Sequence, residues 1–368
     1  MRRGALIGTL LAGVMLLGAG AQFVGGAERL STTDLRAMAA GRAGSTGPRP
    51  LPLEVRGVHV TIGLASLPGK LEDYVDLERD GLTSIELDVK DENGQIGFTR
   101  PAMPLANASG AARDFYDARR AARLMHERGL YLVGRIVVFE DPILAGARPD
   151  LAVRRQDGSV WRDGAGLGWT NPYDRRVWKY NVDVATAAAK AGFDEILFDY
   201  VRFPSDGDVS AAQYANPRSL PKSKAIPAFL RYARGRLDPM GVRVSAAVFG
   251  LSATRDLGIG QIPRRMAPYV DTLYAMTYPS LFGPGELSLA DPSAAPGATV
   301  ALALRHFRHA VRGRDTLLVT WVQDFSFERP YGLEQVRAQI QAARLAGTKG
   351  YMLWNAEGLY TDGALAPP

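Results

Sequence analysis

The sequence predicts a single (β/α)8 TIM barrel over residues 54–368, and three observations support that fold class. Eight short apolar or β-branched runs alternate with amphipathic stretches after residue 54, which is the order of strands and helices in such a barrel. The runs are apolar enough for strands that are covered on both faces. The segment after the first run, 61–66, reads TIGLAS and lacks the G-x-G-x-x-G turn that the alternative, an open doubly wound sheet, would usually carry.

The first 53 residues are predicted to lie outside the barrel. Residues 1–27 begin with Met-Arg-Arg, continue with an uncharged apolar run, and contain an A-x-A site at Ala19 and Ala21, so they predict a signal peptide. The same run could just span a bilayer as an uncleaved membrane anchor. In both cases we expect an exported protein, periplasmic or extracellular. Residues 28–53 are rich in Ala, Gly, Ser, Thr and Pro and predict a disordered linker.

Strands and helices follow from periodicity and from helix-ending glycines. The predicted strands are 57–61, 84–90, 130–140, 195–203, 243–250, 272–279, 316–325 and 350–356. The clearest predicted helices are 111–128, 173–191 and 333–346, each followed by a glycine (Gly129, Gly192 and Gly347). Asn171 and Pro172 suit the N-cap and first position of the second of these helices.

Composition narrows the chemistry. The chain has 44 Lys and Arg against 38 Asp and Glu, a net charge of +6, and no cysteine. The small surplus without a long basic block predicts no dedicated nucleic-acid surface. The lack of cysteine excludes disulfides, thiolate zinc sites and cysteine nucleophiles. Of the four histidines, His306 and His309 suit a solvated basic helix face better than a metal site. We therefore expect no metal or cofactor, and catalysis by carboxylate, histidine or hydroxyl groups.

Charged residues occur on strand faces that should point into the barrel. On the second run Glu86, Asp88 and Lys90 alternate with apolar residues, so all three are expected to face inward. Arg135 on the third run and Asp199 near the end of the fourth should face inward too. Buried ions need partners, so Arg135 and Lys90 are expected to neutralise the carboxylates. A purely structural ion network is the alternative.

The ends of the later runs supply aromatic and amide side chains suited to a sugar, whose faces stack on rings while its hydroxyls form hydrogen bonds. His59, on the first run, could bind substrate or could be an ordinary core histidine. Trp169 could form part of the sugar platform or anchor a loop. Neighbouring residues of one strand cannot both face inward, so Gln323 and Asp324 cannot both line the site. Asp324 is therefore a weaker candidate than Asp199 for the catalytic carboxylate. The predicted substrate-binding residues are His59, Lys90, Arg135, Trp169, Arg202, Tyr278, Gln323, Trp354 and Asn355.

From about residue 55 to residue 355 the chain resembles the putative glycoside hydrolase domain family DUF4015, a TIM-barrel carbohydrate-active family. The best matching stretch is GFDEILFDYVRFPSDG, 192–207. Supporting stretches are GVHVT, ELDVKDENGQI, GRIVVFEDP, VFG, AMTYPS and MLWNA, in the family's order. The resemblance implies an extracytoplasmic carbohydrate-active barrel with a catalytic carboxylate at Asp199 and a second acidic strand end at Asp88. An acidic residue often precedes VFG in the family, whereas Ala246 and Ala247 stand here, so either the acid lies elsewhere or catalysis is weakened.

These observations give the hypothesis of a glycoside hydrolase that acts on a polysaccharide or oligosaccharide through two carboxyl groups. Asp199 would be the ionised nucleophile or base, held so by Arg202 or Arg135. Asp88 is the first choice for the general acid, and Asp324, Glu140 and Glu357 are the substitutes. The alternative is a non-catalytic glycan-binding barrel tethered at the cell envelope. The expected partner is a carbohydrate polymer, with no nucleic acid, and with membrane contact only through the N-terminal segment.

Overall fold

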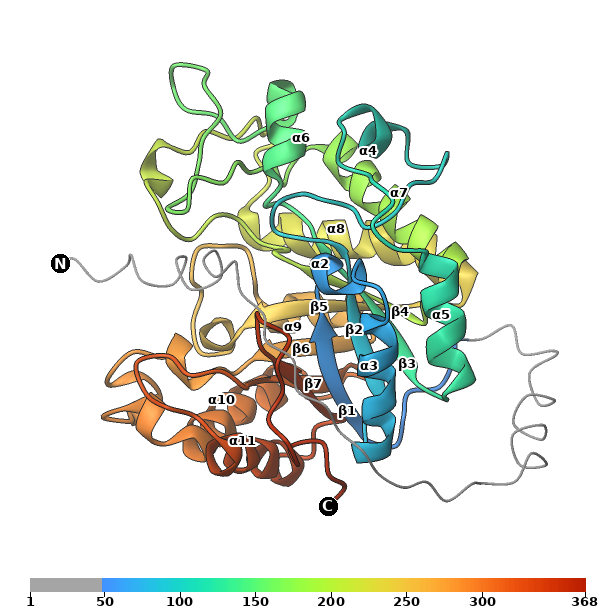
Figure 1. The fold of residues 1–368 in the computed structure, drawn as a ribbon. Coiled ribbons are helices and arrows are strands. Elements are labelled where there is room, and N and C mark those ends of the chain that lie inside the picture. Colours follow the sequence, from blue (N-terminus) through green and yellow to red (C-terminus); the bar gives the residue numbers. More distant parts are fainter. Residues whose placement is uncertain (1–47) are drawn as a thin grey trace.

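The computed structural model describes residues 48–368 (Figure 1). The predicted signal or anchor segment and the linker as far as residue 47 lie outside the described residues. The end of the predicted linker lies against the barrel, because the Arg49 guanidinium is 3.6 Å from the Asp194 carboxylate. Within the described part of the chain, the search for a helix both long and apolar enough to cross a membrane finds none.

Eight parallel strands form a closed barrel, which confirms the predicted fold class. Each strand pairs with its neighbours in chain order, and β1 pairs with both β2 and β8. Seven predicted runs contain their strands, most of which end earlier than predicted, whereas β1 starts at Val55, two residues before the predicted 57. The strands are β1 Val55–Val60, β2 Ser84–Lys90, β3 Tyr131–Val137, β4 Glu195–Asp199, β5 Arg243–Phe249, β6 Thr272–Met276, β7 Leu317–Gln323 and β8 Gly350–Trp354.

Helices surround the barrel and alternate with the strands, as Figure 1 shows. The longer ones are α5 Ala118–Glu127, α7 Arg175–Ala191, α8 Lys222–Leu237, α10 Pro296–Ala310 and α11 Leu333–Leu345. The shorter ones are α2 Ile62–Ala65, α3 Lys70–Asp76, α4 Pro104–Ala108, α6 Pro142–Ala147 and α9 Pro263–Met266. The predicted helix-ending residues Gly129, Gly192 and Gly347 have φ values of 74°, 111° and 68°, the left-handed conformation that glycine adopts without steric cost.

Two predicted helix starts are wrong, in each case because an aspartate further along caps the helix. Asp117 accepts from the backbone N–H groups of the second and third residues of α5, so this helix starts at Ala118 and not at 111. Residues 111–116 instead bond to the loop at 96–97. Asp174 caps α7 in the same way, while Asn171 accepts from Tyr173 N–H in the turn before it.

The core has two layers, one between strands and helices and one inside the barrel. Side chains that fill the barrel include Tyr131, Val133, Leu197 and Met352, whereas their strand neighbours pack against helices. Gly57 makes room for this inner layer, because a Cβ there would lie 2.3 Å from the Met352 sulfur. The inner layer fills the barrel below its C-terminal mouth, so the site residues rest on a packed floor.

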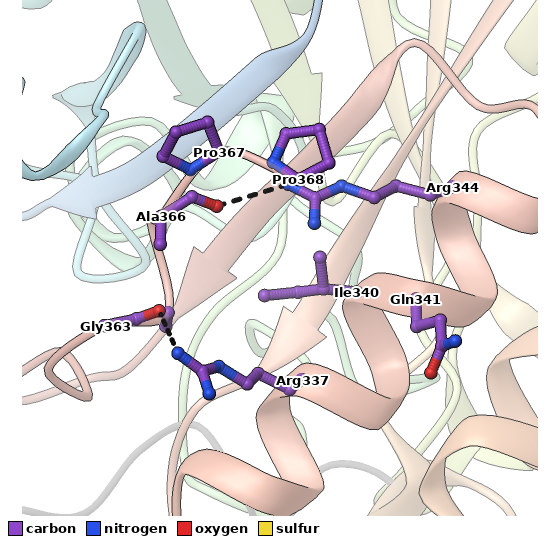
Figure 2. A pocket seen from close by; sticks show the side chains of 9 residues that line it. Arg337, Ile340, Gln341, Arg344, Gly363, Ala366, Pro367 and Pro368 are labelled. Atoms are coloured by element: carbon purple, nitrogen blue, oxygen red, sulfur yellow. Dashed lines mark hydrogen bonds between the residues drawn. The ribbon is translucent and has the colours of Figure 1, made fainter.

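The segment that follows β8 first contacts β1 near the barrel mouth and then packs along α11. Figure 2 shows Arg337 and Arg344 of α11 reaching the carbonyl oxygens of Gly363 and Ala366 beside a hollow of about 410 Å³. Tyr360, earlier in this segment, donates its hydroxyl to the His59 carbonyl oxygen. The segment therefore braces the strand that carries His59.

Glu195, at the start of β4, is buried inside the barrel away from the mouth. Tyr131 donates its hydroxyl to Glu195 Oε2 at 3.0 Å, and the Ser245 hydroxyl donates to Oε1. Burial raises the pKa of Glu195 from its ordinary 4.5 to about 7, although these hydroxyl groups oppose the rise. The folded protein therefore holds more protons than the unfolded chain between pH 4.5 and 7.

The free energy of unfolding of the wild type should fall as pH rises through the pKa of Glu195, and Glu195→Gln should lack this fall. A folded-state pKa of about 7 against 4.5 corresponds to about 3 kcal/mol, lost between those pH values and absent from the variant. Urea denaturation at pH 5 and pH 8 measures the difference. Glu127→Gln, at an exposed position, is the matched control. Equal pH dependence in wild type and Glu195→Gln would contradict the argument.

Candidate active site

The guanidinium of Arg135 joins three acidic residues at the C-terminal mouth of the barrel. Its Nη1 donates to Asp88 Oδ1 at 2.8 Å, and its Nε and Nη2 donate to Asp199 Oδ2 at 2.9 and 2.7 Å. Nη2 also donates to Glu92 Oε1 at 2.5 Å. Asp88 lies directly beside Arg135 in the β2–β3 register. Arg135, Asp88 and Asp199 therefore all face inward, as expected.

Aromatic rings form one wall of this mouth. Trp321 and Trp354 are stacked with centroids 4.9 Å apart, and the Arg135 guanidinium lies 5.0 Å from the Trp354 centroid. Tyr278 stacks on Trp321 at 6.3 Å. Burial raises the pKa of Tyr278 well above its ordinary value, and its hydroxyl has no hydrogen-bond partner among the described residues. The Tyr278 hydroxyl is therefore a buried donor without a described partner beside the ionic groups.

His59 is a cation within the same cluster. Its Nδ1 is 2.9 Å from Glu86 Oε1, and its Nε2 is 3.4 Å from Asp88 Oδ2. Burial lowers the pKa of His59, but the carboxylates of Asp88 and Glu86 outweigh burial and raise it to about 9. Glu86 also accepts from Trp321 Nε1 at 3.0 Å. His59 is thus charged at neutral pH and ties β1 to β2.

Asp199 is held from both sides by N–H donors. Oδ2 accepts from Arg135, and Oδ1 accepts from the backbone N–H of Tyr200 at 2.7 Å. Tyr200 has a φ of 46°, a strained conformation for an aromatic residue that tends to occur at functional sites. Rings and cations on both sides hold it, with Trp169 at 6.0 Å and the Arg202 guanidinium at 4.9 Å. The oxygens of Asp199 therefore act as acceptors in a fixed orientation.

Glu140 has the opposite electrostatic environment. It follows β3, bridges to Trp169 and is 5% exposed. Burial raises its pKa well above the ordinary value; the Arg202 cation opposes this rise, and the nearby acids Asp163 and Glu92 add to it. Its environment therefore favours the protonated, neutral form of the carboxyl group.

Glu140 and Asp199 both act electrostatically on Tyr200. Burial raises the pKa of Tyr200, and the carboxyl groups of Glu140, Glu92 and Asp199 raise it further. All three acids thus lie within electrostatic reach of one phenol. The strand ends thus place a buried carboxyl group with a raised pKa and a carboxyl group bound by N–H donors within electrostatic reach of the same side chain.

Asp88 is the first choice for the general acid, but its pKa is lowered, which does not suit that role. Burial raises its pKa, but His59 and Arg135 outweigh burial and hold the pKa below the ordinary value. Asp88 is therefore ionised at neutral pH. A general acid must carry a proton when it meets the substrate.

Lys90 does not face the barrel, and that expectation is wrong. The β2–β3 register shifts between Asp88 and Lys90, so Lys90 turns toward the helices. Its Nζ lies 2.7 Å from Asp141 Oδ2 and donates to Asn181 Oδ1 of α7 at 3.1 Å. Arg135, together with His59, neutralises the carboxylates of the mouth without Lys90.

Several predicted site residues bond to loops around the mouth. Asp324 accepts from the backbone N–H and the hydroxyl of Thr361, and Asn355 donates to the Asp324 carbonyl oxygen at 2.6 Å. Gln323 accepts from Ser280 N–H at 3.1 Å. The predicted acid substitute Glu357 is exposed. These contacts tie strand ends to loops and to the C-terminal segment.

The loops after β3 and β4 meet through Trp169 and Arg202. Trp169 is fully buried, donates its Nε1 to Asp163 Oδ2 at 2.8 Å, and lies 4.9 Å from the Arg202 guanidinium. Arg202 donates to the Phe203 carbonyl oxygen and to the Ser205 hydroxyl. Trp169 is placed as a loop anchor, and Arg135, not Arg202, bonds to Asp199.

Trp321, Glu92 and Tyr360 were not among the predicted site residues, and neither were Glu86 and Tyr200. Trp321 has the same parity as Gln323 on its strand, so alternation could have found it. Glu92 lies beyond the end of β2 and Tyr360 beyond β8, where no periodic pattern indicates side-chain direction. Residues 48–368 contain no group of three or more acidic or histidine side chains arranged to hold a metal ion.

Comparisons agree on the kind of domain. The family model described as "Putative glycosyl hydrolase domain" (DUF4015) matches residues 57–360. No curated protein matches the chain. The glycoside hydrolase domain of PgaB (BpsB) from Bordetella bronchiseptica has a TM-score of 0.59 and 16% identity, over 83% of this chain and 94% of its own.

Two further solved structures share the fold. The catalytic domain of β-amylase from Paenibacillus polymyxa has a TM-score of 0.56 and 11% identity, over 87% of this chain and 96% of its own. The α-galactosidase TtGalA from Thermus thermophilus has a TM-score of 0.53 and 16% identity, over 87% of this chain and 63% of its own. At these identities the three likenesses establish the barrel fold.

Arg135→Met should destabilise the protein strongly, because it leaves buried carboxylates without their cation. We expect the free energy of unfolding to fall by about 3–5 kcal/mol at pH 7. The deficit should shrink as pH falls, since the unpaired carboxylates then take up protons. Denaturant unfolding at pH 7 and pH 5 measures both effects. Arg119→Met, at an exposed position, should change stability by only about 0.5 kcal/mol. Similar small losses in both variants would contradict the central role of Arg135.

Proposed function

The chain belongs to the family of putative glycosyl hydrolase domains, and we propose that it hydrolyses glycosidic bonds of a polysaccharide or oligosaccharide at the barrel mouth. The observation that carries this proposal is that two carboxyl groups in opposite environments, those of Asp199 and Glu140, both act electrostatically on Tyr200. Asp199 is bound by N–H donors, whereas Glu140 is buried, which raises its pKa well above the ordinary value and favours its protonated form. Glycoside hydrolysis needs one carboxyl group of each kind.

In the proposed mechanism Glu140 donates its proton to the glycosidic oxygen as the bond to the leaving sugar breaks. Asp199, ionised, either attacks the anomeric carbon or takes a proton from the attacking water. Arg135 and the Tyr200 N–H keep the Asp199 oxygens in place, so little reorganisation is needed when charge develops on the sugar. Asp88, ionised beside His59 and Arg135, positions Arg135 and does not act as the acid.

The aromatic wall supports a sugar as the substrate. The stacked rings of Trp321 and Trp354 present the kind of apolar face on which sugar rings lie. The Tyr278 hydroxyl, without a partner among the described residues, would donate a hydrogen bond to a sugar hydroxyl. Extracytoplasmic action is part of the proposal and rests on the apolar segment with its A-x-A site in residues 1–27.

A second candidate function is glycan binding without hydrolysis, by a barrel tethered at the cell envelope. One observation favours it: the strand-five position before VFG, where the family often has an acid, is Ala247, buried beside Ala246. The N–H donors on Asp199 and the raised pKa of Glu140 favour hydrolysis instead. A screen of polysaccharides for both binding and released sugar separates the two functions.

Asp199→Asn should abolish hydrolysis of any polysaccharide that the wild type cleaves. The amide keeps the shape of the side chain but cannot attack or accept a proton, so we expect a loss of at least about 10²-fold in kcat. Released reducing ends measure the rate, and circular dichroism confirms folding. Full activity in this variant would remove Asp199 from the mechanism.

Glu140→Gln should slow cleavage of natural glycosides by about 10²- to 10⁴-fold and much less for aryl glycosides, whose leaving groups need no proton. Wild-type activity should fall as pH rises through the raised pKa of Glu140, and the variant should lack this decline. Asp88→Asn is the control, because loss of a positioning residue should slow both substrates equally. A leaving-group dependence in Asp88→Asn and none in Glu140→Gln would reverse the assignment.

A further inference from the structure

A second hollow lies in the long loop between β2 and α5, next to the candidate active site. Its volume is about 690 Å³, and it is lined by Arg100, Asp114, Phe115, Tyr116, Asp117 and Arg119. Sites for small molecules commonly have about 300–1,000 Å³. The loop follows the C-terminal end of β2, so the hollow belongs to the face of the barrel that carries the site.

One side chain links this hollow to the mouth. Tyr116 forms part of the lining, and its hydroxyl donates to the Asp88 carbonyl oxygen at 2.9 Å. The ring is closely held, because a Cβ on Gly97 would lie 2.3 Å from it and Phe98 packs edge-on at 6.0 Å. The Tyr116 side chain, held in place by this packing, therefore separates the hollow from the strand end that carries Asp88.

The hollow offers free polar groups next to aromatic rings. Arg119 is exposed, and its guanidinium forms no ion pair or hydrogen bond with residues 48–368. Asp117 Oδ1 caps α5, and its other oxygen has no described donor. Asp114 bonds to Thr99. Phe115 is only partly buried.

The balance of charge in the lining indicates what kind of ligand would suit it. Two arginines and two aspartates line the hollow, so their formal charges cancel. A fixed anion or cation gains little there, whereas a sugar hydroxyl, which both donates and accepts, can use a guanidinium and a carboxylate together. The rings of Phe115 and Tyr116 add the apolar face on which a sugar ring packs.

We propose that this hollow is a distal subsite for an uncharged sugar unit of the substrate chain, so that the enzyme acts on polymers long enough to reach it from Asp199. The inference rests on the proposed function and adds a length requirement to it. Binding energy gained at the subsite would serve to hold and orient the chain while the bond near Asp199 is cleaved.

The test compares Arg119→Gln and Phe115→Leu with the control Arg123→Gln, which lies one turn further along α5 and outside the lining. The substrates are oligosaccharides of two, four and eight units from a neutral polysaccharide that the wild type cleaves. Both test variants should lower kcat/KM on the longest substrate about five- to tenfold and leave the disaccharide unchanged. The control should behave as wild type throughout.

Equal losses on short and long substrates, or no loss on the long one, would overturn the subsite and leave the proposed function intact. If the wild type cleaves no glycan, the proposed function fails, and calorimetric titration with cello-, malto- and chito-octaose tests the hollow alone. Weaker binding by Arg119→Gln than by Arg123→Gln would then support the subsite. Equal binding, or no binding by any form, would overturn it.

Discussion

The Arg135 guanidinium is the contact on which the barrel mouth depends. Carboxylates from β2, from the turn after it and from β4 would repel one another in a buried space, at a cost of several kcal/mol for each uncompensated charge. Arg135 donates to all three and lies against the Trp354 ring. The contact that makes their burial tolerable also gives Asp199 its orientation. The same Arg135 contacts therefore stabilise the fold and orient Asp199.

Environment, not residue type, distinguishes the acids of this barrel. Asp88 lies beside cations and its pKa is lowered, whereas burial dominates at Glu140 and raises its pKa. Because their pKa values differ in this way, one site can hold a proton donor and a carboxylate at the same pH. Glu195, buried away from the mouth with hydroxyl partners, shows that a raised pKa alone does not mark catalysis. Glu140 differs from Glu195 because it follows the C-terminal end of β3 and shares Tyr200 with Asp199 as an electrostatic neighbour.

Alternation along strands predicted much of the inward-facing set. Asp199, Arg135 and Asp88 lie where a period of two places them, because a regular strand turns every second side chain to the same face. The rule failed at Lys90, where the register shifts and reverses the face. It also said nothing about Glu92 or Tyr360, which lie outside regular strands and reach the cluster through loop geometry.

The sequence by itself determined the barrel, because strand and helix periodicity and helix caps are properties of neighbouring residues. It also determined which residue types were available at the strand ends. Only the tertiary structure decided their partners and their charge, since these depend on groups far apart in the chain. The Trp321 indole and the Glu86 carboxylate it binds are 235 residues apart. Burial, which raises the pKa of Glu140, arises only when distant loops close around it.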